Sequence, residues 1–164
     1  MTALRIYKKT IDFISNIIYI LIIMYALISA PALFGYKPVI VLSGSMEPTF
    51  KVGNVIYYHH VPEDELKQAD IITFSYGNSE DLITHRINEI NDGKYQTKGD
   101  ANGNPDQQLI EYADIKGKVS KIYIPYVGYF IKYINEHIYI IVIAILILLS
   151  EFILDNLKVF KKNN

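Results

Sequence analysis

The fold of this chain is set first by its most apolar stretch, which reads Ile17-Ile18-Tyr19-Ile20-Leu21-Ile22-Ile23-Met24-Tyr25-Ala26-Leu27-Ile28. This stretch lies inside a run of about 24 residues, from Phe13 to Tyr36, that has no charged side chain. Roughly 20 apolar residues in a helix are enough to cross a bilayer core. We therefore expect a cytoplasmic N-terminus at residues 1–12 and a transmembrane helix at residues 13–35.

The same stretch also has the layout of a secretory signal peptide. Arg5, Lys8 and Lys9 form a basic start, and Ala30-Pro31-Ala32 has the pattern of a cleavage site. The apolar run is slightly longer than the roughly 7–15 residues of such peptides, which favours a retained anchor over a cleaved signal. Under both interpretations the residues that follow are exported.

A second apolar stretch, Ile138–Leu154, contains one charged residue, Glu151, within about one turn of its end. A helix buried in a protein core usually has a polar face. This stretch is apolar all round, so we expect a second transmembrane helix at residues 137–156, followed by a cytoplasmic tail at residues 157–164.

The charges indicate the topology. The chain has 164 residues, 51% of them apolar, and a net charge of −1. Residues 1–35 carry three basic side chains and one acidic one, residues 36–136 carry ten and fourteen, and residues 137–164 carry three and two. Basic residues that flank membrane spans stay in the cytoplasm. A two-span protein of the cell membrane with both termini inside and residues 36–136 outside agrees with the flanking side chains Arg5, Lys8, Lys9, Lys158, Lys161 and Lys162.

Composition also excludes several classes of protein. The chain is too apolar to be disordered, and it lacks the net positive charge typical of nucleic-acid-binding proteins. It has no cysteine, which excludes a disulfide scaffold, a cysteine-ligated metal site and a thiol nucleophile.

The middle of the chain has the pattern of a small, mainly β domain, either a barrel or a folded-over sheet. Asn91-Asp92-Gly93, between two alternating runs, is a hairpin signal. A short helix is expected at Pro62–Gln68, because Pro and acidic residues suit a first turn. The expected strands are rich in β-branched and aromatic residues and cover Val39–Leu42, Val55–His59, Ile71–Tyr76, Leu82–Ile90, Tyr95–Lys98 and Val119–Ile124.

A nucleophile in a chain without cysteine is Ser, Thr, Lys or a carboxylate. Ser45 lies in a turn after an expected strand, within Ser43-Gly44-Ser45-Met46-Glu47-Pro48-Thr49. A serine hydroxyl needs a base, and His85 lies mid-strand with Thr84 and Arg86 on the opposite face. A base needs an orienting carboxylate, for which the candidates lie in the loop that follows Lys98.

That loop also has a calcium-binding interpretation. Asp100, Asn102, Asn104 and Glu111 stand at positions 1, 3, 5 and 12 of an EF-hand loop. Position 6 should be Gly, but it is Pro105, whose fixed φ cannot make the required turn. The flanking segments also read as strands, so calcium binding is the weaker interpretation.

Taken together, these motifs resemble those of type I signal peptidases, in particular the Ser–His subtype of archaea, the endoplasmic reticulum and some Gram-positive bacteria. The resemblance covers about residues 10–155. Two positions depart from it: Asn54 follows Gly53 where the family usually has Asp, and Ala69 precedes Asp70 where the family usually has Gly. The matching segments, in the family's order, are Ser43–Thr49, Thr84-His85-Arg86, Lys98–Asn102 with Asp106, and Ile124-Pro125-Tyr126-Val127-Gly128.

The resemblance implies roles for individual residues. Ser45 would be the nucleophile, His85 the general base, and Asp106 the carboxylate that orients it. Ser43 and the backbone N–H of Ser45 would form the oxyanion hole. Asp100 stays open as the orienting carboxylate or as a structural residue. Lys98 would be the base in a lysine-type mechanism, but it lies outside Thr84-His85-Arg86, the segment that matches the position of the base in this family. No metal or other cofactor is expected.

The resemblance also implies the partners. The substrates would be secretory preproteins with small side chains before the scissile bond, and the enzyme would lie in a lipid bilayer and bind no nucleic acid. Accessory subunits stay undetermined. Two other functions stay open: a catalytically silent, membrane-anchored β module that binds exported proteins, and a self-cleaving serine protease of the related repressor type. The expected spans, and the absence of a DNA-binding helical domain from this sequence, argue against the second.

Overall fold

The computed structural model describes residues 2–77 and 79–163. Side chains at both ends, including those of Lys158, Lys161 and Lys162, lie outside the described part. The chain divides into two compact units. One unit consists of Pro31–Ile131, and the other combines Met1–Ala30 with Lys132–Asn164. The two units are described separately below.

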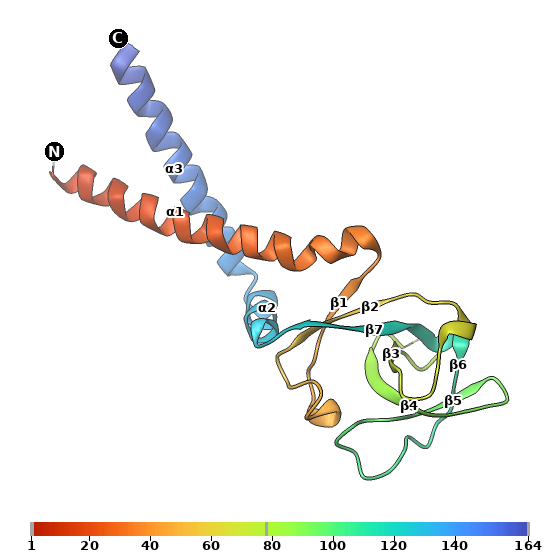
Figure 1. Ribbon diagram of the computed structural model, residues 1–164. Helices are drawn as coiled ribbons and strands as arrows, with labels where there is room; N and C mark the ends of the chain where they lie inside the picture. The colour runs from red at the N-terminus through yellow and green to blue at the C-terminus, as the bar shows by residue number, and fades with distance from the viewer. Residues whose placement is uncertain (1, 78, 164) are drawn as a thin grey trace. The chain divides into compact units, whose positions relative to one another are not determined.

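The Pro31–Ile131 unit is built on one antiparallel half-barrel of seven strands, which confirms the mainly β fold (Figure 1). The spatial order of the strands is β1-β2-β7-β3-β4-β5-β6, so β1 and β6 form the edges. The strands are β1 (Lys37–Ile40), β2 (Val55–His59), β3 (Ile71–Phe74), β4 (Ile83–Asn91), β5 (Lys94–Lys98), β6 (Ile110–Glu111) and β7 (Ile115–Ile124).

The hairpin signal at Asn91-Asp92-Gly93 is confirmed. Asn91 pairs with Lys94 at the end of β4 and β5, which leaves a two-residue loop. Asp92 and Gly93 both have positive φ, of 50° and 72°. This is the requirement of a type I′ turn, which Asp-Gly satisfies and most other residue pairs do not.

The prediction of a helix at Pro62–Gln68 is wrong. The structure has a single 3-10 turn there, η3 (Glu63–Glu65). Val61 before the turn and Leu66 after it are both buried in the core, at 5% and 6% exposure. Burial of both side chains folds the segment around one turn, and the acidic residues between them face solvent. Tertiary packing therefore overrides the local helix signal.

Two clusters of buried side chains form the core of this unit. The first, between β3, β4 and β5, contains Val61, Leu66, Ile72, Phe74, Ile87, Tyr95, Ile110 and Ile115. The second, beside β2 and β7, contains Met46, Phe50, Ile56, Tyr58 and Val119. The second cluster matters for function because Met46 and Phe50 belong to the segment that carries Ser45.

The other unit is helical. It contains α1 (Thr2–Ser29) and α3 (Tyr139–Asn163). The 3-10 turn η1 (Ala30–Phe34) follows α1 and lies almost wholly in the Pro31–Ile131 unit. A shorter helix, α2 (Val127–Glu136), crosses the boundary between the two units before α3 and was not predicted. Two segments, Arg5–Phe34 and Tyr139–Asn156, are long and apolar enough to cross a membrane. Most of their large apolar side chains are exposed, and Ile11 is a buried exception.

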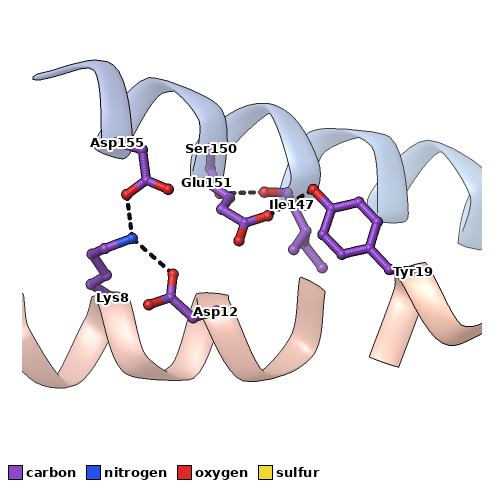
Figure 2. Close-up of polar contacts among 7 residues, drawn as sticks. All are labelled: Lys8, Asp12, Tyr19, Ile147, Ser150, Glu151 and Asp155. Carbon is purple, nitrogen blue, oxygen red and sulfur yellow. Dashed lines mark hydrogen bonds and ion pairs between the residues drawn. The ribbon is translucent and has the colours of Figure 1, made fainter. Parts of the chain in front are cut away.

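Helices α1 and α3 contact each other, and polar side chains join them (Figure 2). The Lys8 ammonium group binds both Asp12 on its own helix and Asp155 on α3. Farther along, the Tyr19 hydroxyl donates to Glu151 Oε2 at 3.1 Å. Ser15, on the same stripe of α1, is fully buried, so a small residue lies between the two polar contacts.

Candidate active site

Ser45 lies in a short 3-10 turn, η2 (Gly44–Met46), that follows edge strand β1. The next residue, Met46, is 2% exposed in the second core cluster, and its carbonyl accepts a hydrogen bond from the Phe50 N–H at 2.9 Å. Ser45 itself is only partly covered. A buried anchor directly beside an accessible hydroxyl fixes the turn while leaving Ser45 within reach of a ligand.

The loop that follows Lys98, here called the acidic loop because it contains Asp100 and Asp106, holds the backbone of Ser45. The N–H of Ala101 donates to the Ser45 carbonyl at 2.9 Å. A Cβ atom at Gly99 would lie 2.6 Å from the same carbonyl oxygen, closer than any side chain tolerates. Only glycine at position 99 allows this approach. The Lys98–Asn102 motif therefore contacts the Ser45 turn directly.

His85 lies in strand β4, on the face that also carries the buried Ile87. His85 is 9% exposed, and its ring packs against Phe74 at an interplanar angle of 66°. Its Nδ1 atom lies 2.6 Å from Asp106 Oδ2. Because an ionised carboxylate only accepts, Nδ1 carries the proton in this contact, and Nε2 has its lone pair available as a base.

Asp106 is held from the neighbouring strand β5. Its backbone N–H donates to the Thr97 carbonyl at 2.8 Å, and the Thr97 hydroxyl donates to Asp106 Oδ2 at 2.6 Å. Sequence reasoning missed Thr97. The signal was a polar residue at an inward position of the alternating strand, since Tyr95 and Thr97 are both buried there. Burial, and to a lesser extent the charge of Asp106, raises the pKa of the nearby Tyr76 hydroxyl.

Asp100 has different partners. The guanidinium of Arg86 donates two hydrogen bonds to its carboxylate, from Nε at 2.8 Å and from Nη2 at 2.7 Å. The Thr49 hydroxyl also donates to it. The hydrogen bonds from Arg86, and then that from Thr49, hold the pKa of Asp100 below its usual range despite partial burial. The hydrogen bonds with Asp100 in turn raise the pKa of Arg86.

The Asp100 contacts connect three motifs. Thr49 belongs to the segment of Ser45, and Arg86 follows His85 directly in β4. Arg86 Nη1 also donates to the Ala69 carbonyl, and Ala69 has a φ of 74°. Position 69 is the one where glycine was expected, and its left-handed backbone supplies the physical reason for that expectation.

No hydrogen bond joins Ser45 and His85 among the described residues. The η2 turn lies beside strand β4. Within the described residues, Ser45 Oγ has one hydrogen-bond contact, with Ser43 Oγ at 3.3 Å, and none with His85. Nucleophile and base are commonly looser in free enzymes than in substrate complexes.

The alternative base, Lys98, lines a cavity of about 280 Å³ together with Arg86 and Asp100. Two other histidines have aromatic neighbours: His59 packs against Tyr36, and His137 stacks on Tyr133. In the part of the chain that the structure describes, no three His, Asp or Glu side chains are grouped in a way that could hold a metal ion.

Known proteins with similar sequences were found among the peptidases. The chain is 33% identical to "Signal peptidase I W" of Bacillus subtilis (strain 168) over 129 residues, which cover 68% of this chain and 67% of that protein. It is 32% identical over 111 residues to "Signal peptidase complex catalytic subunit SEC11C" of Canis lupus familiaris, over 60% of this chain and 57% of that one. For "Signal peptidase complex catalytic subunit SEC11" of Candida dubliniensis, the identity is 34% over 62% of this chain and 67% of that protein. No protein-family model matches the chain.

Proposed function

The chain belongs to the type I signal peptidase family, and from this premise we propose that it removes signal peptides from exported preproteins by a Ser–His–Asp mechanism. Relatives with this name are peptidases, so the chemical class is peptide-bond hydrolysis. The proposal assigns Ser45 as nucleophile, His85 as general base and Asp106 as the carboxylate that orients the base.

The contact between His85 Nδ1 and Asp106 Oδ2, at 2.6 Å, is the observation that carries this assignment. It joins residues 21 positions apart, and it fixes the tautomer in which Nε2 accepts a proton. Asp100 is engaged by Arg86 and Thr49, which supports a structural role for Asp100 rather than an orienting one. Lys98 lies on the wall of a cavity beside Arg86, which gives no support to a lysine base.

In the proposed reaction, Ser45 Oγ attacks the carbonyl carbon of the scissile bond while His85 Nε2 takes its proton. The C–N bond then breaks as the imidazolium gives that proton to the leaving amine, which frees the mature protein. Water, deprotonated by His85, hydrolyses the acyl-enzyme and releases the signal peptide. Asp106 stays ionised throughout and stabilises the imidazolium.

The negative charge that develops on the carbonyl oxygen needs hydrogen-bond donors. We assign these to the Ser43 hydroxyl and the Ser45 backbone N–H. Each such donor lowers the barrier by about 2.7–4 kcal/mol in known acyl-transfer enzymes. The distance of 3.3 Å between the Ser43 and Ser45 hydroxyl oxygens supports this, because it brings a donor to the nucleophile.

The substrate would bind as an extended segment. Edge strand β1 leads directly into the Ser43–Thr49 segment, so a peptide that pairs with a sheet edge there would run toward Ser45. Small side chains before the scissile bond would enter shallow pockets. In the proposed topology, residues 13–35 and 137–156 span the membrane, both termini are cytoplasmic, and residues 36–136 face outward.

The test uses purified full-length protein and a preprotein with an Ala-x-Ala site. Ser45→Ala and His85→Ala are each expected to abolish processing while membrane insertion is retained. Unchanged processing by Ser45→Ala would refute the enzyme assignment and favour a silent β module that binds exported proteins. Activity of the purified wild type alone would show that no accessory subunit is required.

A further inference from the structure

We propose that Thr97 is a positioning residue for this reaction: its buried hydroxyl fixes the Asp106 carboxylate that orients His85. The inference rests on the proposed function. It concerns a residue outside every motif that the sequence offered for chemistry, and it assigns to Thr97 a role in the rate rather than in the fold alone.

Apart from the pairing of β5 with its neighbours, the described hydrogen bonds of Thr97 involve Asp106. The Thr97 hydroxyl donates to Asp106 Oδ2 at 2.6 Å, and the Thr97 carbonyl accepts the Asp106 N–H at 2.8 Å. The same Oδ2 atom accepts the hydrogen bond from His85 Nδ1, also at 2.6 Å. Two of the three described hydrogen bonds of Asp106 are therefore shared with Thr97, one donated by the Thr97 hydroxyl and one by the Asp106 N–H. Together they set both the backbone and the side chain of the acid.

The strand register explains why Thr97 reaches this position. Thr97 lies opposite Ile87 in the β4–β5 pair, and Ile87 and His85 share one face of β4. Thr97 is 0% exposed, so its side chain lies on the inner face of the same pair of strands. His85 and Thr97 are diagonal neighbours across the two strands, and one carboxylate oxygen reaches both.

The Thr97 hydroxyl acts as a hydrogen-bond donor to Asp106, which is a role beyond filling space in the core. A carboxylate that accepts one hydrogen bond can rotate about its terminal torsion, whereas a second donor on the same oxygen fixes the rotation. The second donor also stabilises the ionised form, which must persist while His85 is positively charged. A valine side chain has the same shape as threonine but no donor. Shape and donor are therefore separable by substitution.

The test measures processing of an Ala-x-Ala preprotein by the purified full chain with Thr97→Val and Thr97→Ser. Thr97→Val is expected to lower kcat by about ten- to hundredfold with KM nearly unchanged, because a displaced base slows the chemical step and not substrate binding. Thr97→Ser, which keeps the hydroxyl, is expected to stay within about threefold of the wild type.

A pH profile separates a positioning role from a structural one. Without the Thr97 donor, the Asp106 charge is less compensated and stabilises the imidazolium more, so the acid limb of kcat/KM should move to higher pH. The other ionisable groups that interact with this pair are Tyr76, which feels the charge of Asp106, and Asp100, which is close to His85 and is paired with Arg86 from the opposite face of β4. Both variants retain these groups. A lower kcat with an unmoved limb, or Thr97→Ser as slow as Thr97→Val, would overturn the proposal.

Two controls keep the result decisive. Ser45→Ala gives the background: processing by that variant would refute the proposed function itself, whereas an inactive Ser45→Ala beside a fully active Thr97→Val would refute only the role of Thr97. If Thr97→Val unfolds, the comparison of Thr97→Ala with Thr97→Ser replaces it, because that pair also differs by the hydroxyl. Equal kcat in that pair would likewise overturn the proposal.

Discussion

Both units of the molecule engage acidic side chains in hydrogen bonds, but with different arrangements of partners. In the β unit, Asp106 and Asp100 each accept hydrogen bonds from two or more residues on different segments. In the helical unit, Lys8 binds both Asp12 on its own helix and Asp155 on the other helix, and Tyr19 binds Glu151 (Figure 2). Donors from several segments fix the orientation of a carboxylate, whereas the contacts of Lys8 and Tyr19 join one helix to the other. The comparison indicates that the β unit holds its two carboxylates in fixed orientations and that the helices use their polar side chains for pairing.

The largest expected effect tests whether acids in the two units differ in function. Asp106→Asn should lower kcat by roughly 10³–10⁴-fold, because an amide at this position favours the wrong tautomer of His85. The matched control is Asp155→Asn, which removes an acid of the helical unit and should leave kcat unchanged. Initial rates of preprotein cleavage measure both. Similar losses in the two variants would contradict the comparison.

A smaller effect is expected for the second acid of the β unit. Asp100→Asn should lower the free energy of unfolding at pH 7 by roughly 1–2 kcal/mol, since the hydrogen bonds from Arg86 are charge-assisted but Arg86 is 34% exposed. It should reduce kcat far less than Asp106→Asn. Thermal unfolding in detergent micelles measures the stability, and cleavage rates measure the activity.

The pH dependence of that stability has a definite sign. Hydrogen bonds from Arg86 lower the pKa of Asp100 in the folded state. The stabilisation is therefore complete above the unfolded pKa, about 4, and is lost as the pH falls through the lower folded value. The difference between wild type and Asp100→Asn should shrink below about pH 4. A difference that stays constant down to pH 2 would contradict this account.

The pairing role of the helical contacts is tested by cross-linking. The chain has no cysteine, so a double variant with Asp12→Cys and Asp155→Cys contains only the two introduced thiols. These thiols lie on either side of Lys8, and no native thiol can form a competing disulfide. Adding Tyr19→Phe should lower the yield of oxidative cross-linking severalfold, since it removes the bond to Glu151. Tyr25→Phe, at a tyrosine that is 63% exposed, is the matched control. Equal yields for the two tyrosine variants would show that the Glu151 contact is dispensable.

The smallest effect concerns backbone strain next to the Arg86 network. Ala69 has a φ of 74°, which costs a non-glycine residue roughly 1–2 kcal/mol. Ala69→Gly should therefore stabilise the protein, by about 0.5–1 kcal/mol after the greater entropy of glycine in the unfolded chain is subtracted. Thermal unfolding measures the gain. Ala69→Val should destabilise the protein. If Ala69→Val unfolded at a higher temperature than Ala69→Gly, the assignment of backbone strain to position 69 would be contradicted.

Local patterns predicted most of the architecture. The two apolar helices, the hairpin at Asp92-Gly93 and six of the strands follow from composition, turn chemistry and alternation. Strand β6 (Ile110–Glu111) is too short to show an alternating pattern. Helix α2 (Val127–Glu136) was not predicted, and its first residues belong to the Ile124–Gly128 motif. The 3-10 turn at Glu63–Glu65 replaced an expected helix because Val61 and Leu66 are both buried.

The sequence by itself determined which kinds of residue are present and in what order: two apolar helices around a β unit, a serine turn, a strand histidine and an acidic loop. Tertiary structure decided which acid meets which base. Asp100 and Asp106 are six positions apart in one loop, and no local pattern distinguishes them. The register of β4 against β5 brings Thr97 and Asp106 to His85, while Arg86, on the opposite face, takes Asp100. Strand pairing is a long-range property, so these partners emerge only when the sheet forms.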